Sequence, residues 1–452
     1  MSRRPETVVA EEGERAEQAV DSRARFTGRG WAFLAAGALC LLLATWLGRK
    51  DVLALALFLG GTPLFSALSL YVVKPRVLLK RGVDPALVTA GDAAAVHLWV
   101  RHRSRRGGTV HGVVAVHETV PEPLGGDREL TVEAGGEPAG YTVRPRRRGV
   151  WVLGPATVRV ADPFGLAAEL LDASERTTLY VAPDPAELPE ISAHRLRESG
   201  TDPSRTALPQ PGPDNVMTRE YRHGDPMRRV HWAASAKHDK LMVRQEDPRS
   251  TRRLTLLLDL DEASWPGERL WAGVLPSTAG FEWAVSFTAA VLEHLTQRET
   301  AVHAVDGFGR PLPRGGEDDD ALPAQGRATA ITDDGSEDAL HGLARVRPVR
   351  APERAADEDP LADRFDRDGL VHPVLLVSGE LGEYAAERMV RGTRRAAAGS
   401  AVLVTSAERR VPHGAAVLEE AGWSVVVVPP GTAAEDAWAR LGAGTRSAGA
   451  AR

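Results

Sequence analysis

The side chains best able to do chemistry are concentrated in one segment, residues 219–245, which reads REYRHGDPMRRVHWAASAKHDKLMVRQ. His223, Asp225 and His231 could act as metal ligands, but their spacing matches none of the compact patterns of protein metal sites. Ser235, with His231 and Asp225, could form a nucleophile, a base and an orienting acid. No glycine-flanked nucleophile elbow accompanies them. A hydrolase or transferase using the His223, Asp225 and His231 neighbourhood is therefore an alternative and not the favoured interpretation.

Two non-catalytic interpretations of the same segment are open. The first is a surface that binds anions or carboxylates, because guanidinium groups pair with carboxylates in a bidentate manner and an indole can stack on them. The residues that would build it are Arg219, Arg222, Arg228, Arg229 and Trp232. The second is a buried polar network that joins two neighbouring modules. We expect one of these roles rather than an enzyme.

Several functional classes are excluded by composition. The formal net charge of -5 gives no basic surplus for nucleic-acid binding. The single cysteine, Cys40, lies in an apolar run, so the remainder of the chain has neither a thiolate metal site nor a cysteine nucleophile. No G-x-x-x-x-G-K-[ST] phosphate loop occurs, so the chain is not a P-loop ATPase. We expect no cofactor.

Two long apolar runs near the N-terminus predict a membrane anchor. Residues 31–48 and 52–73 contain no charged residue and are separated only by Arg49, Lys50 and Asp51. A bilayer core of about 30 Å is crossed by roughly 20 helical residues, so both runs are long enough to span it. They predict a tight transmembrane hairpin.

The flanking positive charges predict the orientation of this hairpin, since lysine and arginine favour the cytoplasmic side. They are Arg15, Arg23, Arg25 and Arg29 before it and Lys74, Arg76, Lys80 and Arg81 after it. The hairpin tip carries only Arg49 and Lys50. We therefore expect a multi-pass protein of the cell membrane with both termini in the cytoplasm.

The residues that follow the hairpin predict an all-β, sandwich-like module. Residues 95–100 alternate between two faces, with Val96, Leu98 and Val100 on one and His97 and Trp99 on the other, and paired glycines separate several further short runs. This pattern is typical of an antiparallel sandwich. Asp162 to Leu166, reading DPFGL, predicts a turn with an apolar plug that seals a strand end.

From Arg252 onward, strands and helices alternate, which predicts an α/β doubly wound parallel sheet. Expected strands cover residues 254–260, 301–305, 371–377, 401–405 and 424–428, and expected helices cover 281–295, 384–395, 414–421 and 433–441. An acidic stretch at 315–369 interrupts this pattern. Within it, only residues 336–346 have a helical pattern, and we expect the remainder to be an irregular insertion.

These patterns divide the chain into six segments. They are a disordered cytoplasmic N-terminus (1–29), a transmembrane helical hairpin (30–73), a β-rich module (75–185), a connector (186–250), an α/β domain with the acidic insertion (251–442) and a disordered tail (443–452). The connector contains the segment 219–245, which is called the dense motif below.

The dense motif and the upstream DPFGL box resemble the signature of the bacterial domain of unknown function 58 family. The signature positions are Arg219, Glu220, Tyr221, Gly224, Asp225, Arg228, His231, Trp232 and Lys237. Members of this family are typically encoded beside MoxR-type AAA+ ATPases. The resemblance implies a membrane-anchored cytoplasmic adaptor that binds such an ATPase and membrane or envelope protein clients during complex assembly or maturation.

The first strand of the α/β region also resembles that of the von Willebrand factor A-like fold, in which an Asp-x-Ser-x-Ser loop often holds Mg²⁺. Here the loop reads Asp259-Leu260-Asp261-Glu262-Ala263, and alanine has no ligand atom. Gly379 stands where a further acidic ligand would follow a later strand. Asp259 and Asp261 are therefore a degenerate candidate pair, and we expect no dedicated metal site.

Overall fold

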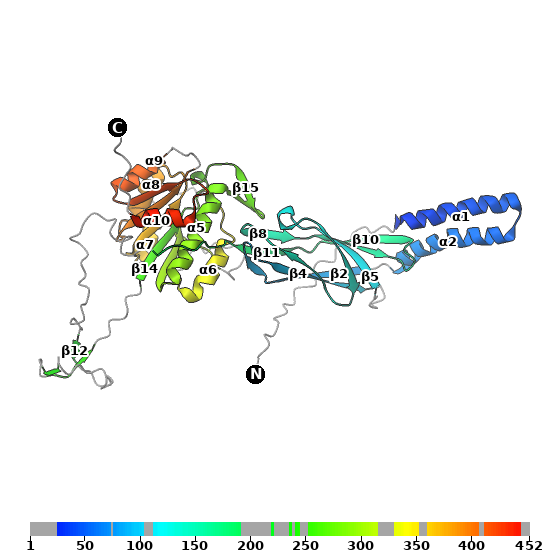
Figure 1. The fold of residues 1–452 in the computed structure, drawn as a ribbon, viewed down its shortest axis with the longest axis horizontal. Coiled ribbons are helices and arrows are strands. Elements are labelled where there is room, and N and C mark those ends of the chain that lie inside the picture. The colour runs from blue at the N-terminus through cyan, green and yellow to red at the C-terminus, as the bar shows by residue number, and fades with distance from the viewer. Residues whose placement is uncertain are drawn as a thin grey trace. The chain divides into compact units, whose positions relative to one another are not determined.

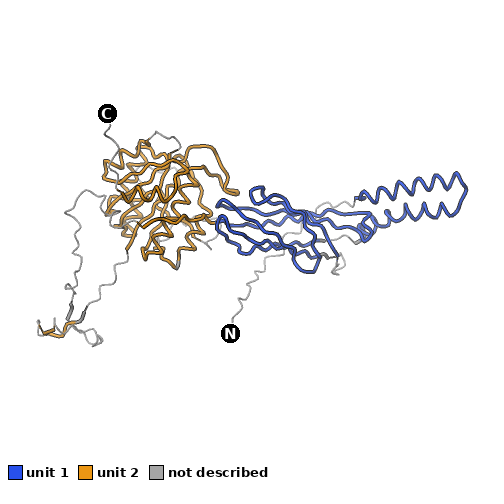
Figure 2. The backbone as a smooth tube through the Cα atoms, viewed as in Figure 1, with its two compact units in different colours: residues 1–181 blue, residues 182–452 orange. Residues whose placement is uncertain are grey.

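A computed structural model describes residues 25–73, 76–103, 112–190, 218–220, 235–236, 240–244, 252–314, 330–351, 359–405 and 411–443. The chain forms two compact units, residues 1–181 and residues 182–452 (Figure 2). Each unit is described separately.

Unit 1 begins with two apolar helices, α1 (Gly28–Leu47) and α2 (Lys50–Val73). Both are long and apolar enough to cross a membrane. Their large side chains point outward, as shown by Trp46, which is 83% exposed. The two helices approach closely at Gly37, where an added Cβ would lie 2.8 Å from the backbone nitrogen of Gly60. Small residues at such a crossing are typical of helices packed within lipid. These features support membrane association.

The rest of unit 1 is β-rich. Its strands are β1 (Arg25–Phe26), β2 (Arg76–Asp84), β3 (Leu87–Thr89), β4 (Ala94–Arg103), β5 (Gly112–Glu118), β6 (Arg128–Ala134), β7 (Ala139–Val143), β8 (Gly149–Leu153), β9 (Ala156–Ala161), β10 (Ala167–Ala173) and β11 (Thr177–Ala182). They form three sheets, ordered β1-β10-β9-β5-β6, β2-β4-β7 and β3-β11-β8 (Figure 1). Neighbouring strands are antiparallel in the five-stranded sheet, in the β2-β4-β7 sheet and in the β11–β8 pair.

Strand β4 contributes to both apolar cores of this module. Leu98 and Val100 pack with residues of β5, β6 and β9, whereas Ala94 and Val96 pack with residues of β8 and β11. Alternate residues of a strand point to the same face, so one face of β4 serves both cores.

A buried ion pair lies within this β-rich region. The Arg81 guanidinium donates to both carboxylate oxygens of Glu118, at 2.8 and 3.0 Å, and neither side chain is exposed. Arg81 also donates to the carbonyl of Glu175 and the hydroxyl of Thr177. Arg81 was counted among the charges that orient the membrane hairpin, but its burial removes it from the membrane surface.

The first membrane helix is joined to the β-rich region by β1. Arg25 and Phe26 pair with Ala168 and Ala167 of β10. The sequence predicted that residues 1–29 lack regular structure, whereas residues 25–26 form a strand and α1 starts at Gly28. The remaining residues of that segment, 1–24, lie outside the described part of the chain, as does the tail beyond residue 443.

Unit 2 contains the predicted α/β domain, whose elements run from β14 to α10 (Figure 1). Its parallel sheet has the strand order β17-β14-β18-β19-β20. The strands are β14 (Arg252–Leu258), β17 (Thr300–Asp306), β18 (Val374–Ser378), β19 (Gly399–Val404) and β20 (Ser424–Val428). The helices are α5 (Ala279–Thr296), α6 (Ser336–Leu343), α7 (Pro360–Asp368), α8 (Glu383–Gly392), α9 (His413–Glu420) and α10 (Ala434–Ala443). The expected parallel α/β fold is thereby confirmed.

Helices cover both faces of this sheet, which explains why its strands are apolar at successive positions. Leu256 of β14 packs in one core with residues of α5, α6 and α10. Its neighbour Leu257 packs in a second core with residues of α7, α8 and α9. The sheet therefore has no face on which a polar site could form, and polar chemistry is restricted to the strand ends.

Two regular elements were not anticipated. Helix α7 occupies part of the acidic stretch 315–369, where only residues 336–346 were expected to be helical. A hairpin of β15 (Arg269–Ala272) and β16 (Leu275–Thr278) also stands between β14 and α5. This hairpin carries an exposed tryptophan, Trp271.

Candidate functional site

The structure describes only the edges of the signature segment. Arg219 and Glu220 lie on β12 (Thr218–Glu220), which pairs antiparallel with β13 (Met242–Arg244). The Ser235 hydroxyl accepts from the Met242 backbone N–H at 2.9 Å, so it supports this local turn. The other signature residues, Tyr221, Gly224, Asp225, Arg228, His231, Trp232 and Lys237, lie outside the described residues, as does His223. The interpretations of this segment as an anion-binding surface, as a buried polar network between two modules and as a catalytic site all stay predictions.

A second candidate site is defined by the order of the parallel strands. β14 is the first strand of the sheet, and it lies between β17 and β18. The chain therefore leaves β14 toward one side and later returns on the other. In open α/β sheets, ligands bind beyond the carboxyl ends of the strands at such a switch point.

Asp259 occupies this switch point, directly after β14, and it is buried. One carboxylate oxygen accepts from the hydroxyls of Ser264 and Ser378 at 2.6 and 2.8 Å, and the other accepts from the Asp261 backbone N–H at 3.0 Å. Burial raises the pKa of Asp259, and these hydrogen bonds act in the opposite direction. The indole of Trp265 donates to the Asp259 carbonyl at 2.9 Å. Asp259 therefore organises the loop after β14.

The donor set around Asp259 does not fit a dedicated Mg²⁺ site. Mg²⁺ requires near-octahedral oxygen ligands. Both oxygens of Asp259 already accept hydrogen bonds, and one carboxylate oxygen of Asp261 accepts from the Ala263 backbone N–H at 3.1 Å. Among the described residues, no group of three or more His, Cys, Asp and Glu side chains could hold a metal ion.

Gly379 has a packing role at this edge. An added Cβ there would lie 1.9 Å from the Ser264 carbonyl, the acceptor of a 2.7 Å hydrogen bond from the Glu380 backbone N–H. The loops after β14 and β18 therefore touch through their backbones. Position 379, where the metal-binding loop pattern would place an acidic ligand, therefore has no room for any side chain.

A second buried carboxylate, Asp306, ends β17 at the same edge. One of its oxygens accepts from the backbone N–H groups of Phe308 and Arg310, at 2.9 and 2.7 Å. The other oxygen has no hydrogen-bond partner among the described residues. Burial is the main cause that raises the pKa of Asp306 from 3.8 to about 6, and the charge of Asp259 adds to the effect. Asp306 is therefore a titratable group near neutral pH.

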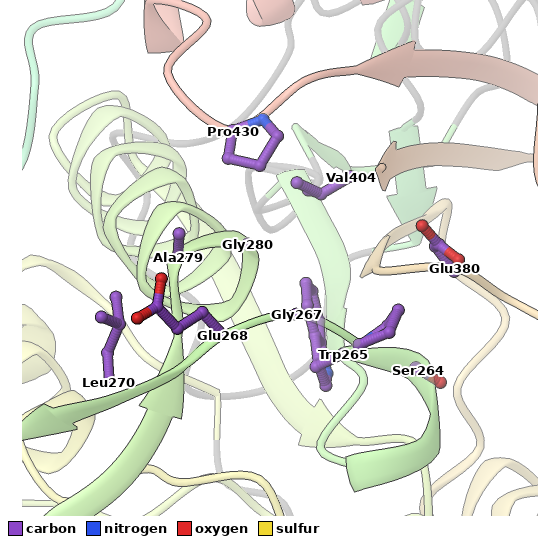
Figure 3. A pocket seen from close by; sticks show the side chains of 11 residues that line it. Ser264, Trp265, Gly267, Glu268, Leu270, Ala279, Gly280, Glu380, Val404 and Pro430 are labelled. Atoms are coloured by element: carbon purple, nitrogen blue, oxygen red, sulfur yellow. The ribbon is translucent and has the colours of Figure 1, made fainter. Parts of the chain in front are cut away.

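A pocket of about 160 Å³ opens beside the Asp259 loop (Figure 3). Its lining residues are Ser264, Trp265, Pro266, Gly267, Glu268, Leu270, Ala279, Gly280, Glu380, Val404 and Pro430. Figure 3 shows Glu268 and Glu380 on opposite sides of Trp265. The Glu380 carboxylate accepts from the Thr405 hydroxyl at 3.3 Å. The pocket thus combines an apolar floor with two carboxylates.

Sequence reasoning found Asp259 and Asp261 but missed Ser264, Ser378 and Asp306. The available signal was position, because Ser378 and Asp306 are each the last residue of a buried strand. Ser378 contacts an aspartate 119 positions earlier, and only the strand order brings the two together.

Comparisons with known proteins give little beyond the family. No curated protein matches the chain. One similar solved structure is a cycloisomaltooligosaccharide glucanotransferase of Paenibacillus sp. complexed with cycloisomaltoheptaose, at 10% identity and a TM-score of 0.14. The alignment covers 77% of this chain and 48% of that one, so the chain spans about half the length of that protein. A likeness at this level carries no argument about fold or function.

The family comparison agrees with the signature seen in the sequence. Residues 217–427 match the family model described as "Protein of unknown function DUF58". The match begins just before β12 and runs through β14, β17, β18 and β19 into β20. It therefore includes the signature segment, Asp259 and most of the pocket lining. Residues 217–427 of this chain therefore belong to the DUF58 family.

Proposed function

We propose that this protein is a membrane-anchored adaptor whose α/β domain binds a protein partner at the carboxyl edge of its parallel sheet. In this proposal the partner is a MoxR-type AAA+ ATPase, the clients are membrane or envelope proteins, and the domain is a von Willebrand factor A-like domain without a metal. Neither the domain nor the dense motif acts as an enzyme.

The size of the pocket beside Trp265 is the observation that carries the proposal. Sites for drug-sized ligands usually enclose about 300–1,000 Å³. The 160 Å³ found here suits one side chain of a partner. The carboxylate of Glu268, which lines the pocket, makes a basic side chain the complementary occupant.

The β15–β16 hairpin adds a second contact point. Leu270 lines the pocket, and the next residue, Trp271, is 59% exposed. Exposed tryptophans beside a pocket are common centres of binding energy at protein interfaces. A partner that fills the pocket would cover the indole of Trp271 at the same time.

The loops that form this surface are held in place before any partner arrives. The Asp259 carboxylate ties the β14 loop to Ser378, and backbone contacts tie it to the β18 loop. Preorganised surfaces lose less conformational entropy on binding. A fixed binding surface therefore accounts for the buried carboxylate without requiring it to react.

Membrane topology completes the proposal. The hairpin tip contains only two basic residues, Arg49 and Lys50, whereas more lysine and arginine residues flank the two ends of the hairpin. Arg25 and Arg29 are exposed at the other end of α1. Positive charge favours the cytoplasmic side. Both termini and the α/β domain are therefore assigned to the cytoplasm.

Affinity purification of the full chain from a mild detergent tests the proposal. The natural protein should recover an AAA+ ATPase, identified by mass spectrometry, in amounts reduced about tenfold by Trp271→Ala or Glu268→Gln, the loss produced by about 1.4 kcal/mol. The matched control is Glu420→Gln, which changes an exposed glutamate on α9 next to the amino ends of the strands. Equal recovery of the ATPase with the natural protein and all variants would show that the pocket is not the binding site. Failure to recover any AAA+ ATPase, or turnover of a substrate abolished by His231→Ala, would contradict the adaptor function.

A further inference from the structure

The Asp162–Leu166 turn has a rigid backbone and an exposed aromatic tip. Asp162 is buried, and its carboxylate accepts from the backbone N–H groups of Phe164 and Ala167, at 2.9 and 2.7 Å. The sequence predicted an apolar plug here. Leu166 is indeed buried, but Phe164 is 61% exposed. These hydrogen bonds fix the backbone conformation of the turn. Phe164 therefore stands at a fixed position of the turn, with its side chain exposed.

This turn is fastened to the start of the first membrane helix. The Thr27 backbone N–H donates to the Leu166 carbonyl at 2.9 Å, and the Thr27 hydroxyl donates to the Gly165 carbonyl at 2.7 Å. Thr27 is also the N-cap of α1, because its hydroxyl accepts from the Gly30 N–H. Gly30 permits the close approach, since an added Cβ would lie 2.1 Å from the Leu166 carbonyl oxygen.

The length of α1 fixes the depth of the turn. Twenty residues rising about 1.5 Å each give about 30 Å, the thickness of a bilayer core. The N-cap of α1 therefore lies at the boundary between acyl chains and headgroups when the helix spans the membrane. The headgroup layer is about 5–8 Å thick, and the Cα of Phe164 lies about 3.8 Å from that of Gly165. The phenyl ring is thus within reach of the lipid interface.

The neighbouring side chains have the character of a lipid interface. Arg25 and Arg29 are exposed on either side of Thr27. Trp31 is 63% exposed and packs edge-on against Phe26, with ring centroids 5.7 Å apart. Aromatic rings and basic groups are enriched at this level because they interact with both headgroups and the upper acyl chains.

We infer that Phe164 is a membrane-interface anchor that binds anionic phospholipid together with Arg25 and Arg29. The inference rests on the proposed membrane insertion of α1 and α2. It gives the β-rich region a third point of contact with the bilayer besides its two helical connections. Such a contact holds the β-rich region against the membrane surface.

Spin labelling of the full chain in phosphatidylethanolamine–phosphatidylglycerol nanodiscs tests this inference. In a Cys40→Ala background, one label is placed by Phe164→Cys and a control label by Ser174→Cys. Ser174 is exposed and follows the opposite end of β10, roughly 23 Å away along the strand. The accessibility ratio of oxygen to a water-soluble nickel chelate should be several-fold higher at position 164 than at position 174. Equal, water-like ratios at both positions would overturn the inference.

Two further measurements separate the possible failures. A spin label on the native Cys40, inside α1, reports membrane insertion by itself. A water-like accessibility ratio at Cys40 would contradict insertion of the helices. A lipid-like ratio at Cys40 together with a water-like ratio at position 164 would contradict only the inference about Phe164. Replacing Phe164 by the photoreactive analogue p-benzoylphenylalanine keeps an aromatic ring. Irradiation should crosslink it to phosphatidylglycerol, and crosslinks to protein alone would assign Phe164 to a protein interface.

Discussion

Asp306→Asn should change how the stability of the α/β domain depends on pH. The natural carboxyl has a pKa raised to about 6 by burial, above the ordinary value of 3.8. A raised acid pKa means that the folded state binds a proton more tightly than the unfolded state, so stability is lost as pH rises through this window. The pKa difference corresponds to about 3 kcal/mol, fully expressed by pH 7, with about half of the loss falling between pH 5 and pH 7.

Asparagine retains the acceptor geometry but has no charge. Its carbonyl oxygen can accept from Phe308 and Arg310 as the carboxylate does. The amide nitrogen replaces an oxygen without a hydrogen-bond partner among the described residues, which costs about 1–3 kcal/mol if it finds no acceptor. That cost is the same at every pH. The pH-dependent part of the difference between variant and natural chain therefore isolates the ionisation of Asp306.

Pulse proteolysis in a urea series, performed on the full chain in detergent between pH 4.5 and pH 8, measures this difference. The natural domain should lose stability relative to Asp306→Asn as pH rises, by more than 1 kcal/mol between pH 5 and pH 7. Asp333→Asn, at an exposed position of the same unit, should leave the slope of the natural chain unchanged. Parallel curves for the natural chain and Asp306→Asn would refute the argument that burial of this carboxyl controls the pH response.

Three further outcomes are expected. Glu118→Ala leaves Arg81 buried without its counter-charge and should destabilise the β-rich region by about 3–5 kcal/mol, whereas replacing both residues by methionine or leucine should recover most of that loss in thermal unfolding. Gly30→Ala should cost about 1–3 kcal/mol because its Cβ meets the Leu166 carbonyl, while Gly28→Ala, with nothing within 4 Å, should not change the melting temperature. Calorimetric titration of the full chain with Mg²⁺ or Mn²⁺ should show no micromolar binding, and a saturable isotherm of that affinity would contradict the fit argument at Asp259.

Continuous β-branched and aliphatic runs could be located accurately from the sequence. The strand at 424–428 was predicted with the bounds that the structure shows, because four consecutive valines follow Ser424 and end at Pro429. The apolar periodicity that predicted the helix at 281–295 likewise matches α5. Both signals come from residues that are buried because they are apolar.

Helix α7 was missed because its buried face includes a charge. Arg364 is 3% exposed, donates to the Gly309 carbonyl at 2.7 Å and pairs with Asp368 at 3.1 Å. Only Leu361 and Phe365 supply buried apolar side chains. A search for apolar periodicity reads such a segment as a polar loop, since Arg364 and Asp368 count as polar and the Gly309 carbonyl that accepts from the arginine lies 55 positions away.

The candidate site was predictable only in part for a related reason. An aspartate at the end of an apolar strand is a local signal, and it pointed to Asp259. The hydroxyls that bind its carboxylate come from a short loop and from a strand that is adjacent only through the sheet order. The role of Gly379 depends on a backbone contact, which no pattern of residue types encodes.

The pairing of β1 with β10 has a practical consequence for anyone who wishes to remove the membrane helices. A shortened chain that starts after α2 would lose Arg25 and Phe26 as well, and the margin of the five-stranded sheet would then be the bare backbone of Ala167 and Ala168. An uncovered strand invites pairing with other chains. Soluble versions of this region should therefore retain residues 25–27, rejoined to β2 by a flexible linker, if they are to remain monomeric.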